Sequence, residues 1–409
     1  MTPELRNLGI GILLLVAIFG GSYAYETALF GLLPRSLEQH ATAVISTCAS
    51  ESYPPSCYDL EIPKLMDQGL SMEETFEVTR LIQNQVDNYF YCHVLGHNVS
   101  AKETAKDPLA WTDVVARCPT GMCSNGCLHG AAQERFRDDA LTDAEIQELI
   151  PELSQICEPG SGRDFTGLEQ ASCYHSLGHL TMYIGGGNIT TAVGVCDQIA
   201  VKDTHDYTQT CYEGAYMQIF QPLEPEDFAL VQDVPATTTV DAKVFCDGFS
   251  GERRAACHRE SWPLYRDSFS EPGGIETFCT LVPDRVSQQR CYNAIFYVLT
   301  AQYSFDEEKV TNMCESVPEK RMGQCFGNAA SRMVETDYRL TPNAVRICER
   351  AQEHGVGDRC YEELVFYSTF NFHEGSEAFL TLCRSLPEPW QTQCVNGEGK
   401  TFQPSKNDY

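Results

Sequence analysis

The sequence predicts an all-α protein, an α-solenoid of about nine disulfide-stapled helical hairpins preceded by an N-terminal membrane helix. The first observation behind this prediction is an internal repeat, because from Cys57 to Cys394 a cysteine returns every 34 to 46 residues. The last four intervals, from Cys257 onward, are 34, 34, 35 and 34 residues, which is the length of one helix–turn–helix unit. The second observation is the presence of 20 cysteines, and the third is an uncharged apolar stretch at residues 8–24.

One repeat, residues 291–324, shows the expected element pattern. Apolar side chains at 294, 295, 298 and 299 have helical spacing, residues 304–306 break the helix, and positions 310, 313 and 314 form the inward face of a second helix. Val317 precedes Pro318 and ends that second helix, because a residue before proline leaves the helical region. The next unit follows the same pattern, with Thr341 as the expected cap and Pro342 in the first turn.

The cysteine spacing predicts one disulfide per repeat, from the second helix of one hairpin to the first helix of the next. Five pairs are 11 or 12 residues apart: Cys246/Cys257, Cys279/Cys291, Cys314/Cys325, Cys348/Cys360 and Cys383/Cys394. Shorter or longer links join Cys48/Cys57, Cys157/Cys173 and Cys196/Cys211. The remaining four cysteines complete the even count if Cys118 pairs with Cys127 and Cys92 with Cys123. Behind an export segment, this many cysteines indicates disulfides and an oxidising compartment.

The apolar stretch sets the expected localisation. Residues 8–24 form a signal anchor or a signal peptide, and both alternatives place the chain beyond about residue 35 outside the cytoplasm. A retained anchor gives a single-pass membrane protein with a periplasmic, extracellular or luminal domain. The expected segments are a short cytoplasmic segment (1–7), the anchor or signal peptide (8–24), a linker (25–47), histidine-bearing repeats (48–220), an inserted loop (221–245), regular cysteine-stapled repeats (246–395) and a polar tail (396–409).

The charge balance restricts the partners. The chain carries 57 acidic and 29 basic residues, for a formal net charge of −28. This excludes nucleic acid as an expected partner, because phosphate binding requires the opposite sign. An acidic surface keeps an exported protein soluble, and it would also attract cations or a basic protein partner.

In its period, helix pairing and one-disulfide-per-hairpin arrangement, the region from Cys48 to Val395 resembles the tetratricopeptide and Sel1-like helical-repeat proteins, above all the cysteine-rich Sel1-like kind. The glycine- and alanine-rich Sel1 consensus is not present. The resemblance implies an α-solenoid, and it implies binding of proteins or peptides, which is what such families mostly do.

A histidine string marks the candidate site. Residues 93–97 and 175–179 both read His-x-Leu-Gly-His, and histidines at i and i+4 share one helix face. Aligning the repeats on this string places His129 level with His93 and His175, and Glu213 at the same level in the following repeat. Five of the ten histidines therefore fall on one face of three successive repeats.

Two arrangements of these side chains are open. Next-nearest helices in a flat array are about 18 to 20 Å apart, too far for one ion. Then His93, His97 and His129 make one metal site, and His175, His179 and Glu213 make another. Alternatively, tight superhelical curvature gathers all six about a mono- or dinuclear centre. Small residues would allow close helix approach there: Gly96, Gly130, Gly178 and Gly214.

Imidazole-rich ligation with a carboxylate suits zinc, copper or iron, which the sequence does not distinguish. We therefore expect a membrane-anchored extracytoplasmic metalloprotein, with Glu213 or Glu134 as a candidate general base on a water activated by the ion in hydrolytic or redox chemistry. Two alternatives remain open. One is an acidic solenoid scaffold for a protein partner, with histidines that only pack. The other is a metal carrier or sensor without catalysis.

Overall fold

The computed structural model describes residues 35–86, 89, 92–119, 122–136, 140–222, 225–282 and 284–400. Within these ranges the fold is all-helical, and its one β-type pairing is an isolated bridge between Val201 and Asp206. No helix in these ranges is long and apolar enough to cross a membrane. The expected anchor at residues 8–24 lies outside the described residues.

The first half of the chain contains the helices that carry the five histidines of the candidate site. Its elements are α2 (Leu37–Cys48), α3 (Pro54–Glu61), η1 (Ile62–Gln68), α4 (Met72–Gln83), α5 (His93–Thr104), η2 (Pro108–Ala110), α6 (Trp111–Arg117), η3 (Cys123–Asn125), α7 (Gly126–Phe136), α8 (Asp143–Ile156), α9 (Gly167–Ile184), α10 (Ile189–Ile199) and α11 (Thr208–Phe220).

The second half continues with shorter connections. Its elements are α12 (Pro225–Val231), α13 (Thr239–Asp247), α14 (Gly251–Glu260), η4 (Trp262–Ser270), α15 (Gly274–Cys279), α16 (Arg285–Gln302), α17 (Glu307–Ser316), α18 (Glu319–Thr336), η5 (Tyr338–Leu340), α19 (Thr341–Glu353), α20 (Gly357–Asn371), α21 (Glu377–Ser385), α22 (Trp390–Val395) and η6 (Glu398–Lys400).

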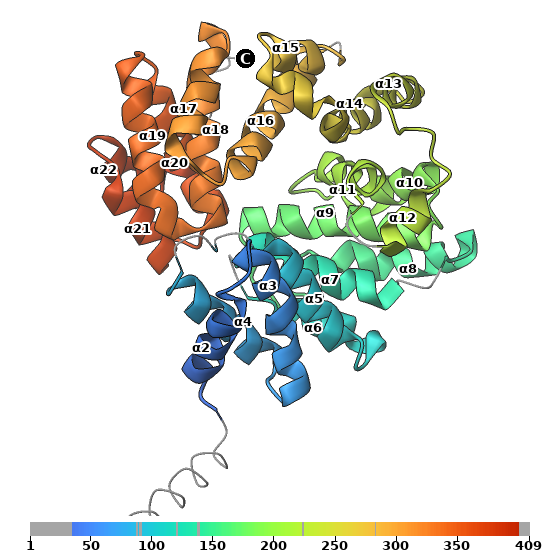
Figure 1. Cartoon of the computed structure of the whole chain (residues 1–409). Coiled ribbons are helices and arrows are strands. Elements are labelled where there is room, and N and C mark those ends of the chain that lie inside the picture. Colours follow the sequence, from blue (N-terminus) through green and yellow to red (C-terminus); the bar gives the residue numbers. More distant parts are fainter. Residues whose placement is uncertain are drawn as a thin grey trace, which may run out of the picture.

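The helical array curls back on itself. Figure 1 shows the chain running from α2 through α8 and α13 and then returning through α18 to α22, beside the N-terminal helices. The return is made by contacts of α20 with α9 and of α18 with η3. Arg339 donates a hydrogen bond to Asn84 over 2.7 Å across this junction, and the ring of Phe370 packs directly on Gly167. The inner helices of distant repeats therefore face one another across a common interior.

The disulfide pattern is confirmed in full. All ten predicted pairs, including Cys118–Cys127 and Cys92–Cys123, are bonded, and no described cysteine is free. Each closure is worth about 2 to 4 kcal/mol by chain-entropy arguments. Ten disulfides indicate an oxidising, extracytoplasmic environment.

The structure differs from the sequence-based expectation in three local elements. The segment 25–47, expected as a linker, contains most of α2, which starts with a capping box between Ser36 and Gln39 and buries one face. The segment 221–245, expected as a loop, contains α12 and the beginning of α13, whose Thr238 caps the helix. Thr341 is the first residue of α19 rather than its cap, and its hydroxyl donates to the carbonyl of Tyr338.

Glycines bring two pairs of inner helices into backbone contact, α5 with α7 and α9 with α11, as the sequence predicts. A Cβ atom on Gly130 of α7 would lie 2.2 Å from the carbonyl oxygen of His97 on α5. A Cβ atom on Gly214 of α11 would lie 2.0 Å from the carbonyl oxygen of His175 on α9. Both distances are far inside van der Waals contact, so only glycine permits this spacing.

We expect Gly214→Ala to lower the free energy of unfolding by about 1 to 3 kcal/mol, because the added methyl group forces α9 and α11 apart. Gly194, inside α10, is the matched control, since a Cβ atom there meets nothing within 4 Å. Gly194→Ala should instead stabilise the protein by up to about 1 kcal/mol. Denaturant unfolding of both variants checks this, and equal effects would contradict the packing argument.

Candidate metal centre

Five imidazoles gather where three inner helices, α5, α7 and α9, lie side by side. His93 and His97 come from α5, His129 from α7, and His175 and His179 from α9. The ring centroid of His129 lies 4.8 Å from that of His93, 5.0 Å from His97, 5.6 Å from His175 and 5.4 Å from His179. The curvature of the array thus brings the five rings into one cluster, with His129 in contact with both pairs.

Three of these rings have the spacing of metal ligands. The Nε2 atoms of His93 and His97 are 3.1 Å apart. Donor nitrogens of His93, His97 and His129 all lie within 4.8 Å of one another, as a group of described residues that could hold an ion. Two nitrogens about 2.0 to 2.1 Å from one ion at a tetrahedral angle lie about 3.3 Å apart. The His93–His97 pair already has this separation.

Side chains behind the cluster fix the orientation of His97. Gln133 hydrogen-bonds to His97, and the amide nitrogen of Gln133 donates to the hydroxyl of Tyr183 over 2.9 Å. Tyr183 in turn donates to the carboxylate of Asp227, which is buried on α12. A carboxylate that orients a ligand histidine from behind is the usual outer shell of a metal site. The segment expected as an inserted loop therefore contributes Asp227 to this shell.

Loss of water keeps the imidazoles neutral. Burial is the largest cause that lowers the pKa of His97, His129 and His175 well below the usual value, and the neighbouring imidazoles lower it further. Burial also lowers the pKa of His179, against a hydrogen bond with Gln218 that raises it. The neutral imidazole is the form that ligates metal ions, so the site competes little with protons at neutral pH.

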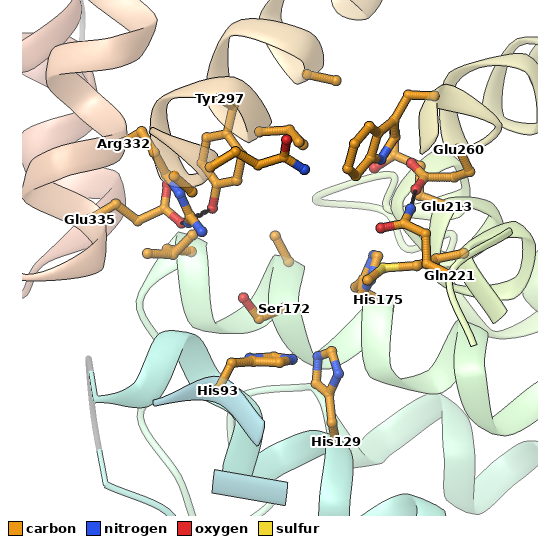
Figure 2. A pocket seen from close by; sticks show the side chains of 18 of the residues that line it. His93, His129, Ser172, His175, Glu213, Gln221, Glu260, Tyr297, Arg332 and Glu335 are labelled. Atoms are coloured by element: carbon orange, nitrogen blue, oxygen red, sulfur yellow. Dashed lines mark hydrogen bonds and ion pairs between the residues drawn. The ribbon is translucent and has the colours of Figure 1, made fainter. Parts of the chain in front are cut away.

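The cluster opens onto a large interior cavity. The cavity has a volume of about 920 Å³, and His93, His129 and His175 form part of its wall. Figure 2 shows these three side chains on one side of the cavity, with two groups of charged residues beyond them on either flank. The other walls are mostly apolar, with Trp262 and Phe305 among them. A small molecule inside could touch an ion on the histidines and the charged groups together.

One flank carries two carboxyl groups. Glu213 of α11 is ion-paired with Arg259 of α14, and Glu260 lies next to them in the cavity wall. Burial raises the pKa of Glu260 to about 8, and the charge of Glu213 adds to this shift. Gln221 donates a hydrogen bond of 3.0 Å to Glu260. At neutral pH, Glu260 therefore holds a proton beside an ion-paired carboxylate.

The opposite flank is built from α16 and α18. Arg332 lies over the ring of Tyr297, with its guanidinium carbon 3.8 Å from the ring centroid, and it donates to the Tyr297 hydroxyl. The same guanidinium group is 3.0 Å from Glu335, whose pKa is raised by burial against the pull of Arg332. Tyr297 also donates to Glu335, so the three side chains form one network.

The predicted site residues divide into two sets. The five histidines come together, whereas Glu213 lines the same cavity but is ion-paired with Arg259 and is not one of the three grouped metal ligands. Glu134 lies on α7 and is not among the residues that line the cavity. Apart from Glu213, sequence reasoning missed the residues of the two flanks, and it missed the outer shell. A signal existed for Tyr297, because it follows Cys291 by six residues as His179 follows Cys173.

Comparison of the chain with protein-family models, with curated proteins and with solved structures gave no match.

One disulfide does not link neighbouring helices of successive hairpins as the others do, and it lies next to the histidine cluster. Cys92 precedes His93 at the start of α5, and its bond to Cys123 spans 31 residues to the turn before α7. We expect the double variant Cys92→Ser/Cys123→Ser to lose metal affinity at least tenfold, because α5 and α7 can then shift relative to each other. Cys383→Ser/Cys394→Ser, at the far end of the array, should keep its affinity. Zinc titration against a competing chelator compares the two, and equal losses would contradict this role of the Cys92–Cys123 disulfide.

The raised pKa of Glu260 predicts a pH-dependent stability. Between about pH 4.5 and pH 8 the folded state holds a proton on Glu260 that the unfolded state has released, so stability falls as pH rises through this window. Glu260→Gln removes this loss, because glutamine is neutral at every pH. We expect the variant to melt at a higher temperature than the wild type at pH 8, and the gap to close toward pH 4.5. Exposed Glu271→Gln is the control, and a gap that does not vary with pH would contradict the assignment.

Proposed function

We propose that this protein is an extracytoplasmic metalloprotein that holds a transition-metal ion on His93, His97 and His129 and presents it to a substrate in the interior cavity. The observation that carries the proposal is the grouping of three imidazole donors within 4.8 Å, on two helices held in backbone contact. Three neutral imidazoles are a common ligand set for a metal that keeps one coordination position open.

The donor chemistry narrows the choice of metal. A set made of imidazole nitrogens suits zinc, copper or iron and disfavours magnesium and calcium, which prefer oxygen ligands. All described cysteines are oxidised to disulfides, so no thiolate competes with the histidines as a ligand among the described residues. The three metals remain candidates on equal terms.

The cavity supports catalysis over simple storage. A carrier site is best served by saturated ligation, whereas here His93 and His129 form part of the wall of a cavity of about 920 Å³. An ion bound there supplies Lewis-acid or redox chemistry. Glu260, with its pKa of about 8, is the proton donor on the flank, and the neighbouring Glu213 is the candidate proton acceptor. Two carboxyl groups in different environments are a recurrent acid–base arrangement.

Metal analysis tests the proposal directly. Protein exported without a histidine tag and purified without chelators should contain zinc, copper or iron at one equivalent or more per chain. His97→Ala and His129→Ala should each lower the affinity by at least a hundredfold, because removal of one of three ligands leaves a two-coordinate site. His354→Ala is the matched control, since His354 is partly exposed and paired with Glu315. A wild-type protein that cannot be loaded with any of the three metals would refute the proposal.

Localisation and partners form a separate part of the proposal. Residues 8–24 serve as the membrane attachment, and the acidic exterior is the surface for a protein partner, on the strength of the apolar stretch and the net charge of −28. Carbonate extraction of membranes distinguishes a retained anchor from a cleaved signal peptide.

A further inference from the structure

We infer that the cluster holds a second metal ion, bound by His175 and His179 next to the first, so that the centre is dinuclear. The inference rests on the proposed centre at His93, His97 and His129 and adds a site to it. Its basis is the donor geometry of the second histidine pair, which repeats that of the first.

The two pairs have the same local geometry. The Nε2 atoms of His175 and His179 are 3.2 Å apart, against 3.1 Å between those of His93 and His97. In each case the histidines are four residues apart on one helix, and the glycine before the second histidine lies against the neighbouring helix. A separation of 3.2 Å is close to the value of about 3.3 Å for two nitrogens on one tetrahedral ion.

Outer contacts direct the lone pairs of the second pair toward each other. The Nδ1 atom of His179 is 2.7 Å from the Oε1 atom of Gln218, so Nδ1 carries the proton and Nε2 is left as an acceptor. His175 hydrogen-bonds to the backbone of Thr210. The unprotonated Nε2 atom of His179 therefore faces the Nε2 atom of His175 across 3.2 Å. A cation between the two nitrogens satisfies both lone pairs.

One ion cannot take all five rings. Donors of a single bound ion lie within about 4.2 Å of one another, which is twice a metal–nitrogen bond, and the group of His93, His97 and His129 comes near this limit before any ion is bound. Among the described residues, the group that comes within 4.8 Å contains His93, His97 and His129 but neither His175 nor His179. His129 nevertheless stacks on His175, with an angle of 29° between the ring planes. The second pair is therefore a neighbouring site and not an extension of the first.

The position of His175 gives the second ion access to substrate. His175 lines the cavity together with His93 and His129. Two histidines leave two coordination positions on a tetrahedral ion, and both are available to water or to a group of the substrate. A pair of adjacent ions suits reactions in which one ion holds the attacking oxygen and the other the group that is attacked or leaves.

The test counts ions with cobalt, because Co²⁺ replaces zinc in imidazole sites and its visible absorption reports tetrahedral coordination. Metal-free full-length protein is titrated with Co²⁺, and equilibrium dialysis with Zn²⁺ gives an independent stoichiometry. We expect two equivalents for the wild type and one for His175→Ala/His179→Ala. His175→Gln/His179→Gln is measured in parallel to limit any packing defect, with circular dichroism and disulfide mapping as checks of folding. His354→Ala should bind two equivalents.

The possible outcomes separate this inference from the proposed function. One equivalent for the wild type overturns the second site and leaves the proposed three-histidine site intact. No binding to the wild type overturns both. Two equivalents for the wild type and for both double variants place the second ion elsewhere and overturn the assignment to His175 and His179. Since the wild-type stoichiometry requires no substitution, the inference stays testable even if a variant does not fold.

Discussion

Backbone contact between successive inner helices is the constraint on which the site depends. Gly130 packs on the carbonyl oxygen of His97 and Gly214 on that of His175, so no Cβ atom separates the helices at the level of the rings. At an ordinary helix spacing of about 8 to 10 Å, imidazoles on neighbouring helices reach each other only at full extension. Here the ring centroid of His129 on α7 lies 4.8 Å from that of His93 and 5.0 Å from that of His97, both on α5. The cluster therefore depends on the glycines at the helix contacts as much as on the histidines themselves.

In an array whose repeats contact mainly their neighbours, few long-range contacts keep the inner helices this close together. The disulfides supply additional restraints on their positions. Nine of the ten disulfides link residues 9 to 16 apart and lock each hairpin to the next. The tenth, Cys92–Cys123, links the start of α5 to the turn before α7, next to the site. Ring closure adds a further restraint, because α20 packs on α9, the helix that carries His175 and His179. The first and last parts of the described array are thus tied together beside the histidine cluster.

The sequence specifies local structure well, because cysteine spacing and apolar periodicity are properties of neighbouring residues. It predicts every disulfide and the common face of the five histidines. It does not specify the curvature, which accumulates from small rotations at each helix contact, and so it leaves open whether the histidines form one cluster or two. For the same reason, the sequence does not predict the surroundings of Glu213. Its position in the repeat is that of a metal ligand, but the curvature of the array places Arg259 beside it, and the two side chains form an ion pair. Arg332 and Glu335 reach the cavity only because α18 returns to the N-terminal half.

Binding of divalent ions to the histidine cluster would also require compensating negative charge. Burial lowers the pKa of four of the five imidazoles: His97, His129, His175 and His179. The carboxylate of Asp227 accepts a hydrogen bond from Tyr183 rather than from a ring, and its charge raises the pKa of His179 only against the larger effect of burial. Divalent ions brought into this interior therefore need compensating negative charge, since an unpaired buried charge is strongly disfavoured. Glu213 is already neutralised by Arg259. In the proposed metal-loaded centre, the missing charge would therefore come through the cavity, from hydroxide or from an anionic group of the substrate. We accordingly expect a ligand of the cavity to carry an oxygen anion toward the histidines.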